Sequence, residues 1–392
     1  MDFDRWLQEA TENRPIEPIV LDVPIPISEI PTPALLLDEA KLLRNLNDMA
    51  ELTRSAGLAL RPHSKMHKSP MIAHLQLAHG ASGICCAKVS EAEVMQRAGV
   101  NAILITSPVR DERTLGRVAK LAQENQEMMI VIDAVEAAVS LNQALEASGQ
   151  THHLKVLIDI DPGLGRTGIA PEAGLLELAG TITESCNHLE FWGLQVYAGH
   201  CMHIESVEKR FTRYQRALAF GESAISLLTD AGYEIHLVSG GGTGSIEFEE
   251  GLGLLTEVQA GSYAFMDIEY RDIESRHGPI FDRFEIALSV LVTAISQPKS
   301  GAITVDAGFK SLASDKMAPE FLEIEGLTYF WGGDEHGIVR LDNPSVEVEL
   351  GGKFKLITPH CDPTVNLHDY YYLVREEAVH ELWPVSTRGC SQ

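Results

Sequence analysis

Between Leu58 and Gln259, short apolar runs alternate with longer stretches in which apolar positions recur three and four apart. The short runs suit buried strands, and the longer stretches suit amphipathic helices. Eight runs are strand candidates: LALRP (58–62), GICCA (83–87), AILIT (102–106), MMIVID (128–133), LKVLIDID (154–161), FWGLQVY (191–197), IHLVS (235–239) and TEVQA (256–260). Eight parallel strands joined by helices close into a barrel whose chemistry gathers at the strands' carboxyl ends. The pattern therefore predicts an α/β fold with a (β/α)8 barrel; an open doubly wound sheet is the alternative.

The pattern is different on either side of this region. A ninth apolar run, ALLLD (34–38), precedes the first long helical stretch, and after about residue 275 short β-rich pieces separated by Gly and Pro take over. Such pieces are typical of antiparallel sheets. We expect the barrel to span 40–275, and a second, mainly antiparallel β domain to combine 1–39 with 276–392. The N-terminal strand would pair within that second domain.

Composition narrows the range of partners. The chain has 392 residues, of which 45% are hydrophobic, enough for a barrel of about 250 residues and a further domain. Its net charge of -25 repels phosphate backbones and anionic membranes, so we expect no nucleic-acid or membrane partner. The acidic start MDFDRWLQEATENRP does not resemble a signal peptide. Six cysteines without CxxC spacing fit a reducing cytoplasm.

A basic loop, RPHSKMHKS, follows the first predicted barrel strand, where a barrel enzyme places catalytic groups. Lys65 would become an imine-forming nucleophile if burial and nearby cations lowered its pKa. His63, His67, Lys68 and Arg61 would supply those cations. The competing interpretation is a solvated basic rim, which is the commoner role of such residues.

Two glycine-rich turns follow the last two predicted strands, which is where barrels most often bind phosphate. The first is SGGGTGS (239–245), and the second is AGSY (260–263). Glycines let backbone N–H groups approach a phosphate closely. Two ordinary tight turns are the alternative. A dinucleotide fingerprint is disfavoured because the spacing does not match GxGxxG.

Further polar residues follow the fifth and sixth predicted strands. DIDPGLGRTG places Arg166 in a flexible turn, where it would bind an oxyanion of a cofactor while Asp159 and Asp161 orient it. LQVYAGHCMH supplies four candidates for contact with a cofactor ring or for acid–base roles: Gln195, Tyr197, His200 and His203.

A third motif, PHCDPTVNLHD, lies in the predicted β domain. On an extended segment His360 and Asp362 would point the same way, and Cys361 would point away. One imidazole and one carboxylate suit Mn²⁺, Mg²⁺ or Zn²⁺ with several waters. In GGDEHG, Glu335 and His336 would support the metal or its water.

These motifs occur in an order that resembles one family. From Thr32 to Gly389 the chain is similar to the fold-type III pyridoxal-phosphate enzymes that include D-threonine aldolase, D-serine dehydratase and 3-hydroxy-D-aspartate aldolase. The strings SGGGTGS, GSYAFMD and HCDPTVNLHD are most similar to the 3-hydroxy-D-aspartate aldolase branch. Enzymes of this family couple an alanine-racemase-like barrel to a β domain, usually in a homodimer whose active sites lie near the subunit interface.

The resemblance implies roles for single residues. Lys65 would hold pyridoxal 5'-phosphate (PLP) as a Schiff base, Arg166 would lie by a cofactor oxygen, and the divalent metal would bind His360 and Asp362. The phosphate positions would be Gly242, Thr243, Gly261, Ser262 and Tyr263. D-threonine aldolases carry a His in the loop where this chain has Tyr197, so His200 and His203 become the candidate bases by proximity.

The implied activity is retro-aldol cleavage of a small amino acid, 3-hydroxy-D-aspartate or D-threonine, to glycine and glyoxylate or acetaldehyde. Asp362 favours this reaction, because dehydratases of the family carry Cys at that position. The alternative is a dehydratase acting on D-serine or D-3-hydroxyaspartate and releasing a 2-oxo acid and ammonia. A racemase would not need a metal at the hydroxyl, and a non-catalytic PLP carrier would not need the second domain.

Overall fold

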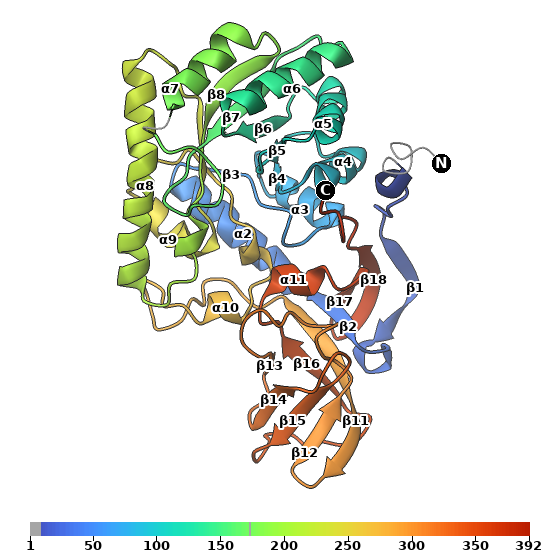
Figure 1. Ribbon diagram of the computed structural model, residues 1–392. Helices are drawn as coiled ribbons and strands as arrows, with labels where there is room; N and C mark the ends of the chain where they lie inside the picture. The colour runs from blue at the N-terminus through green and yellow to red at the C-terminus, as the bar shows by residue number, and fades with distance from the viewer. Residues whose placement is uncertain (1–8, 172–173) are drawn as a thin grey trace.

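Eight parallel strands form one curled sheet in the computed structural model, which describes residues 9–171 and 174–392 (Figure 1). The strand order is β3-β10-β9-β8-β7-β6-β5-β4, and a parallel bridge between His63 and Cys85 joins the two ends. The strands are β3 (Ala59–Leu60), β4 (Ile84–Cys86), β5 (Ile103–Ile105), β6 (Met129–Ile132), β7 (Leu154–Asp159), β8 (Leu189–Val196), β9 (Leu237–Gly240) and β10 (Glu257–Val258). The predicted barrel is confirmed, and each of the eight apolar runs overlaps one of its strands.

Helices connect these strands and cover the outside of the barrel (Figure 1). They are α2 (Glu39–Ser55), α3 (Pro70–Ala78), α4 (Val89–Arg97), α5 (Glu112–Glu124), α6 (Val135–Ser148), α7 (Leu175–Gly180), α8 (Val207–Asp230), α9 (Ile246–Glu249) and α10 (Ile268–Arg271). Helix α5 illustrates how the sequence determines where a helix begins and which face is buried. The Asp111 carboxylate caps its start by accepting a hydrogen bond from Thr114 N at 2.9 Å, and Leu115 and Val118 face the core. Within the described ranges, no helix is both long and apolar enough to cross a lipid bilayer.

The second sheet is mainly antiparallel, as predicted. Its main path runs β1-β18-β17-β2-β11-β12-β15-β14, and β16 joins β13 to β11. The strands are β1 (Ile19–Pro26), β2 (Ala34–Asp38), β11 (Leu288–Lys299), β12 (Ala302–Val305), β13 (Glu320–Phe321), β14 (Leu327–Trp331), β15 (Gly337–Leu341), β16 (Lys353–Ile357), β17 (Tyr370–Arg375) and β18 (Ala378–Pro384). The run ALLLD forms β2, which pairs antiparallel with β11 and parallel with β17. The residue limits proposed for the two domains stay a prediction.

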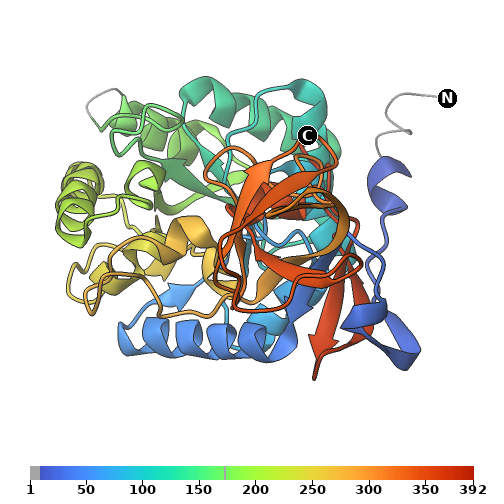
Figure 2. The same cartoon turned by 90° about the horizontal axis from the view of Figure 1, so that it is seen from below.

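The second sheet lies against the barrel, as the view from below shows (Figure 2). One continuous apolar core includes Ile130 of the barrel together with Val290 and Tyr371 of the second sheet. The two parts also share polar contacts, because Tyr371 donates a hydrogen bond to the His67 carbonyl at 2.5 Å. Helix α11 (Cys361–Val365) follows β16 on the side that faces the barrel (Figure 1). The loop that carries Lys65 is therefore covered by residues from the second sheet.

Candidate active site

Lys65 lies in the loop after β3, with its side chain 42% exposed, and its Nζ is 3.8 Å from Asp362 Oδ1. The expected Schiff-base lysine and an expected metal ligand therefore come together from opposite ends of the chain. The predicted lowering of the lysine pKa is wrong. Tyr197 and then Asp362 raise the pKa of Lys65, against the effect of burial. Burial also lowers the pKa of His67 to about 3 and that of His63 well below its usual range, so neither supplies a cation at neutral pH.

Lys68, the other lysine of the basic loop, is buried. Its Nζ lies 2.6 Å from Glu91 Oε1 on helix α4 and 3.4 Å from the carbonyl oxygen of Thr387. An ammonium group held in a buried ion pair must lose that partner before it can act as a nucleophile. Lys65 is the lysine of this loop whose amine is accessible.

The two glycine-rich turns lie side by side, and the second of them contacts the loop that carries Lys65. Thr243 Oγ1 accepts a hydrogen bond from the backbone N–H of Tyr263 at 3.0 Å, which joins one turn to the other. A Cβ at Gly261 would lie 2.9 Å from the His63 carbonyl oxygen, and a Cβ at Gly244 would lie 2.1 Å from that of Met202. Glycine is needed at both positions because another backbone segment approaches there. The phosphate candidates Gly242, Thr243, Gly261, Ser262 and Tyr263 thus form one cluster, packed against the Lys65 loop.

This cluster fits PLP. An accessible primary amine stands beside two glycine-rich turns that carry the hydroxyl groups of Thr243 and Ser262. Such turns suit a phosphate monoester, and the amine suits an aldehyde. Lys65 would hold the aldehyde end, and the two turns would hold the phosphate.

The residues after β7 and β8 divide into two groups. Arg166 is exposed, and its guanidinium carbon lies 5.4 Å from the centre of the Tyr197 ring. Gln195 is instead buried in the barrel, where it donates hydrogen bonds to Asp159 Oδ1 at 2.9 Å and to the Thr106 carbonyl at 3.2 Å. Burial raises the pKa of Asp159 to about 6. Arg166 and Tyr197 remain available to a cofactor, whereas both amide hydrogens of Gln195 already have acceptors.

The two candidate histidines lie in different surroundings. His200 sits in a short 3-10 turn (Gly199–Cys201), and burial lowers its pKa; the charged groups that affect it are Arg213 and Asp161. His203 Nδ1 is 3.4 Å from Glu269 Oε1, and its ring centre is 4.3 Å from that of Tyr270.

Burial lowers the pKa of His203 to about 4, against the opposite effect of Glu269, and His360 and Asp362 are close enough to contribute. Within the described part of the chain, the buried His203 Nε2 has no hydrogen-bond partner. The structure therefore places His203, and not His200, beside the His360–Asp362 pair.

The segment carrying His360 and Asp362 is not extended, contrary to the prediction. His360 is the N-cap residue of α11, and Asp362 lies in the first turn of that helix. Cys361 does not point away: its Sγ lies 3.5 Å from Asp362 Oδ2. The two expected ligands still converge, because His360 Nε2 is 3.9 Å from Asp362 Oδ2.

The His360–Asp362 pair fits a divalent cation. Asp315 Oδ2 lies 2.8 Å from His360 Nδ1, so the other ring nitrogen is left to face Asp362. Histidines that bind metals are usually oriented by a carboxylate in this way. Among the residues that the structure describes, no group of three or more His, Cys, Asp or Glu side chains is arranged to hold a metal. A cation here would take its remaining ligands from water or substrate.

Asp315 is the supporting residue that the sequence argument missed. Glu335 and His336, which were expected to support the metal, lie in the turn between β14 and β15. Glu335 is exposed and pairs with Lys310 at 2.7 Å. Nothing in the local spacing links Asp315 to His360, since the two meet only through the fold.

Three arginines that could otherwise bind a second carboxylate of the substrate are already held in ion pairs. Arg61 is buried with Glu257 at 2.9 Å, Arg110 pairs with Asp133, and Arg271 pairs with Asp272 and Glu320. Lys316 lies closer to the expected chemistry, because its Nζ is 2.8 Å from the same Glu269 oxygen that faces His203.

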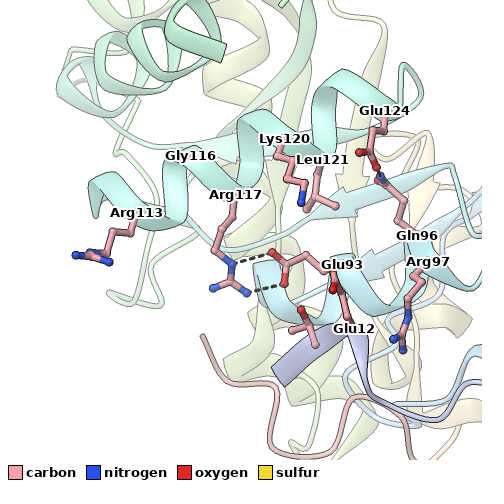
Figure 3. Close-up of a pocket in the computed structure, with 11 residues that line it drawn as sticks. Glu12, Glu93, Gln96, Arg97, Arg113, Gly116, Arg117, Lys120, Leu121 and Glu124 are labelled. Carbon is pink, nitrogen blue, oxygen red and sulfur yellow. Dashed lines mark hydrogen bonds and ion pairs between the residues drawn. The ribbon is translucent and has the colours of Figure 1, made fainter. Parts of the chain in front are cut away.

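A pocket of about 520 Å³ lies elsewhere, between α4, α5 and the segment around Thr11 (Figure 3). Its lining is charged, but Arg117 is held by both oxygens of Glu93, and Gln96 donates to Glu124. None of the expected site residues lines it. The pocket is therefore separate from the Lys65 site.

A closed parallel barrel with a lysine after its first strand, phosphate-type turns after its last two and a second β sheet is the architecture of the alanine racemase type. The family described as "Alanine racemase, N-terminal domain" matches residues 37–269, which is more than half of the chain. A "Putative serine dehydratase domain" matches residues 287–374. The chain belongs to this alanine-racemase-type family, which confirms the resemblance seen in the motifs.

Individual relatives are similar over nearly the whole chain. The 3-hydroxy-D-aspartate aldolase of Paracoccus denitrificans strain Pd 1222 is 38% identical, with 92% of this chain and 93% of that protein covered. The D-threonine aldolase of an Arthrobacter species is also 38% identical, with 94% and 95% covered. The crystal structure of D-threonine aldolase from Filomicrobium marinum matches with a TM-score of 0.90 at 37% identity, covering 95% of this chain and 100% of that one.

Proposed function

We propose that this protein is a carbon–carbon lyase that uses PLP and a divalent metal to cleave a D-3-hydroxy amino acid into glycine and an aldehyde. The observation that carries the proposal is the 3.8 Å approach of Lys65 Nζ to Asp362 Oδ1. It brings an amine suited to the cofactor next to a carboxylate suited to the metal. The names of the relatives support the same reaction, with 3-hydroxy-D-aspartate or D-threonine as substrate.

Each residue of the site would have a separate role in the reaction. When bound, PLP would withdraw electrons from the substrate's α-carbon, and the metal would acidify the 3-hydroxyl. His203 would accept the hydroxyl proton at Nε2, the ring nitrogen that has no partner among the described residues. Glu269 would orient the imidazole through Nδ1. Lys65 would hold the cofactor's aldehyde end and would deliver a proton to the α-carbon of the product, which gives glycine.

Arg166 and Tyr197 would border the cofactor on the side of β7 and β8, where the guanidinium carbon lies 5.4 Å from the ring centre. The phosphate would lie in the cluster made by the two glycine-rich turns. His360 and Asp362 would hold Mn²⁺, Mg²⁺ or Zn²⁺, with Asp315 orienting His360. His200 has no role in this scheme, because the charged groups that affect it are Arg213 and Asp161, whereas those that affect His203 include His360 and Asp362.

The test is a product analysis with PLP and Mn²⁺ present. D-threonine should give acetaldehyde and glycine, and 3-hydroxy-D-aspartate should give glyoxylate and glycine, whereas the L-isomers should give neither. Chelation by EDTA should abolish both reactions and leave the PLP absorbance in place. A 2-oxo acid with ammonia as the products would establish the dehydratase instead.

Borohydride reduction tests the cofactor lysine separately. In the wild-type protein the reduced PLP adduct should map to the peptide that contains Lys65, and Lys65→Ala should lose it. An adduct that persists in Lys65→Ala would move the assignment to Lys68 or another lysine.

We also propose that the protein is a cytoplasmic homodimer. Large apolar side chains are exposed on the second sheet, where Phe330 of β14 and Ile338 of β15 are paired across the strands. Exposed apolar residues grouped in this way commonly mark protein interfaces. Sedimentation equilibrium should give twice the mass of the 42.9 kDa chain, and a monomer at micromolar concentration would contradict the proposal.

A further inference from the structure

A buried clamp joins the Lys65 loop to two distant segments. We define the Lys68 clamp as Lys68, Glu91 on helix α4 and Thr387 in the segment after β18. Lys68 Nζ lies 2.6 Å from Glu91 Oε1 and donates to the Thr387 carbonyl at 3.4 Å, while Thr387 N donates to the Lys68 carbonyl at 3.0 Å. The Lys68 side chain and backbone are thus both held, three residues beyond Lys65.

Glu91 ties the clamp to the barrel. Its second oxygen, Oε2, accepts hydrogen bonds from Ala87 N at 2.8 Å and from Lys88 N at 3.3 Å, where the chain leaves β4. Glu91 is almost fully buried, so its charge depends on Lys68 and these amides for compensation. One carboxylate therefore sets the position of the Lys65 loop relative to the next strand of the barrel.

The segment 385–392 extends the clamp to the second sheet. Ser90 N donates to the Gln392 carbonyl at 2.9 Å, and Gly389 N donates to Asn366 Oδ1 at 3.0 Å. The segment runs from β18 past the Lys65 loop to the start of α4. It covers the clamp residues, and Thr387 is fully buried.

The backbone of the loop needs such support. Lys68 has a φ of 52°, in the left-handed region that residues other than glycine seldom adopt. A backbone in that region persists where its surroundings over-determine it. The hydrogen bonds of Lys68 on both sides, together with the Tyr371 hydroxyl on the preceding carbonyl of His67, provide that constraint.

We propose that Lys68 and Glu91 are positioning residues for Lys65. They hold the loop so that the Lys65 amine points toward the cofactor cluster and Asp362, and the segment 385–392 is part of this support. The inference rests on the proposed function, since it assumes that Lys65 holds PLP. It gives the second lysine of RPHSKMHKS a role that does not touch the reacting atoms.

The test compares two carboxylates of the same helix. Glu91→Gln removes the charge that compensates Lys68, and Glu93→Gln is the matched control, because Glu93 forms an ion pair of similar length, 2.7 Å, with Arg117. Lys68→Met removes the other half of the clamp. For each full-length protein, the dissociation constant of PLP is measured by absorbance titration, and hydrogen exchange is measured for the peptide spanning 61–69.

We expect Glu91→Gln and Lys68→Met to bind PLP about tenfold more weakly or worse, because a buried charge loses its partner. The 61–69 peptide should exchange faster in both, even well below the melting temperature. Glu93→Gln should match the wild type in both measurements. A protein lacking 386–392 keeps the ion pair but loses the contacts of Thr387, and should bind PLP about threefold more weakly.

Two results would overturn the inference. One is a lower melting temperature in Glu91→Gln and Lys68→Met with unchanged PLP affinity and unchanged exchange of 61–69, which is what a merely structural pair would give. The other is an equal loss in Glu93→Gln. If neither Glu91→Gln nor Lys68→Met folds, the PLP affinity of the protein lacking 386–392 is the deciding measurement. An affinity equal to that of the wild type would contradict the inference. Failure of the wild-type protein to take up PLP at Lys65 would instead refute the proposed function.

Discussion

At the residue scale, burial decides which side chains are charged near the cofactor cluster. Glu249 lies under the first glycine-rich turn, where its Oε1 accepts hydrogen bonds from Tyr214 Oη at 2.6 Å and from Ser245 Oγ at 2.9 Å. Burial raises the pKa of Glu249 to about 7, against the opposite effect of the hydrogen bonds from Tyr214 and Ser245. The turn that we assign to the phosphate therefore rests on a carboxyl group that is largely protonated below neutral pH.

This carboxyl group should make stability depend on pH. Its pKa is raised on folding, so the folded state holds a proton that the unfolded state has lost between about pH 4.3 and 7. That contribution to stability is present at low pH and is lost as the pH rises through 7. The Glu249→Gln side chain keeps an oxygen that can accept the hydrogen bonds from Tyr214 and Ser245, but it does not take up or release a proton. Relative to the wild type, its free energy of unfolding should increase by about 2 kcal/mol between pH 5 and pH 8. Urea unfolding of both proteins at the two pH values measures this, and a constant difference would contradict it.

At the element scale, the barrel depends on close contact between neighbouring strands. Gly193 of β8 pairs with Leu237 of β9, and a Cβ at Gly193 would lie 1.9 Å from the Leu237 carbonyl oxygen. Gly193→Ala should therefore cost about 3 kcal/mol or more of unfolding free energy. Gly116→Ala on helix α5 is the control, because a Cβ there meets nothing within 4 Å. It should stabilise the protein by about 0.5 to 1 kcal/mol. Thermal unfolding of the two variants separates these outcomes, and equal effects would show that the close contact is unimportant.

The sequence predicts those elements that are marked by a pattern within a short stretch of the chain. The eight barrel strands were predictable because each is an apolar run bounded by polar residues. Strand β1 was missed, because its residues are mostly exposed and it pairs with β18 at the other end of the chain. Helix α11 was taken for an extended segment, although Pro363 in its first turn is a recognised feature of helix starts.

The residues of the candidate site likewise differ in whether a short motif marks them in the sequence. Lys65, the glycine-rich turns and His360 with Asp362 were found because each stands in a short motif. Asp315 and Glu269 were not found, since they reach His360 and His203 only in the folded chain. Burial lowers the pKa of both expected cations, His63 and His67, and a sequence does not show how deeply a side chain is buried.

At the scale of the whole molecule, strand β2 packs against two apolar cores, one on each of its faces. Its side chains alternate between two cores: Leu35 and Leu37 join the large core shared with the barrel, while Ala34 and Leu36 join a smaller core with Leu291. Alternation is what a strand buried on both faces requires. The barrel and the second sheet therefore share an apolar core. The Lys68 clamp is a second link between them.

This sharing predicts that the barrel and the second sheet unfold together. Calorimetry of the PLP-free protein should show a single transition, and Leu37→Ala should lower it without splitting it. Because Leu37 is fully buried in the large core, the change should cost about 2 to 5 kcal/mol. Leu367→Ala, at an exposed leucine, is the control and should shift the transition little. Far-ultraviolet circular dichroism and tryptophan fluorescence, to which Trp192 of β8 and Trp383 of β18 both contribute, should change at the same temperature as the heat-capacity peak. Two resolved transitions in the wild type would mean that the shared core does not couple the barrel to the sheet that carries His360 and Asp362.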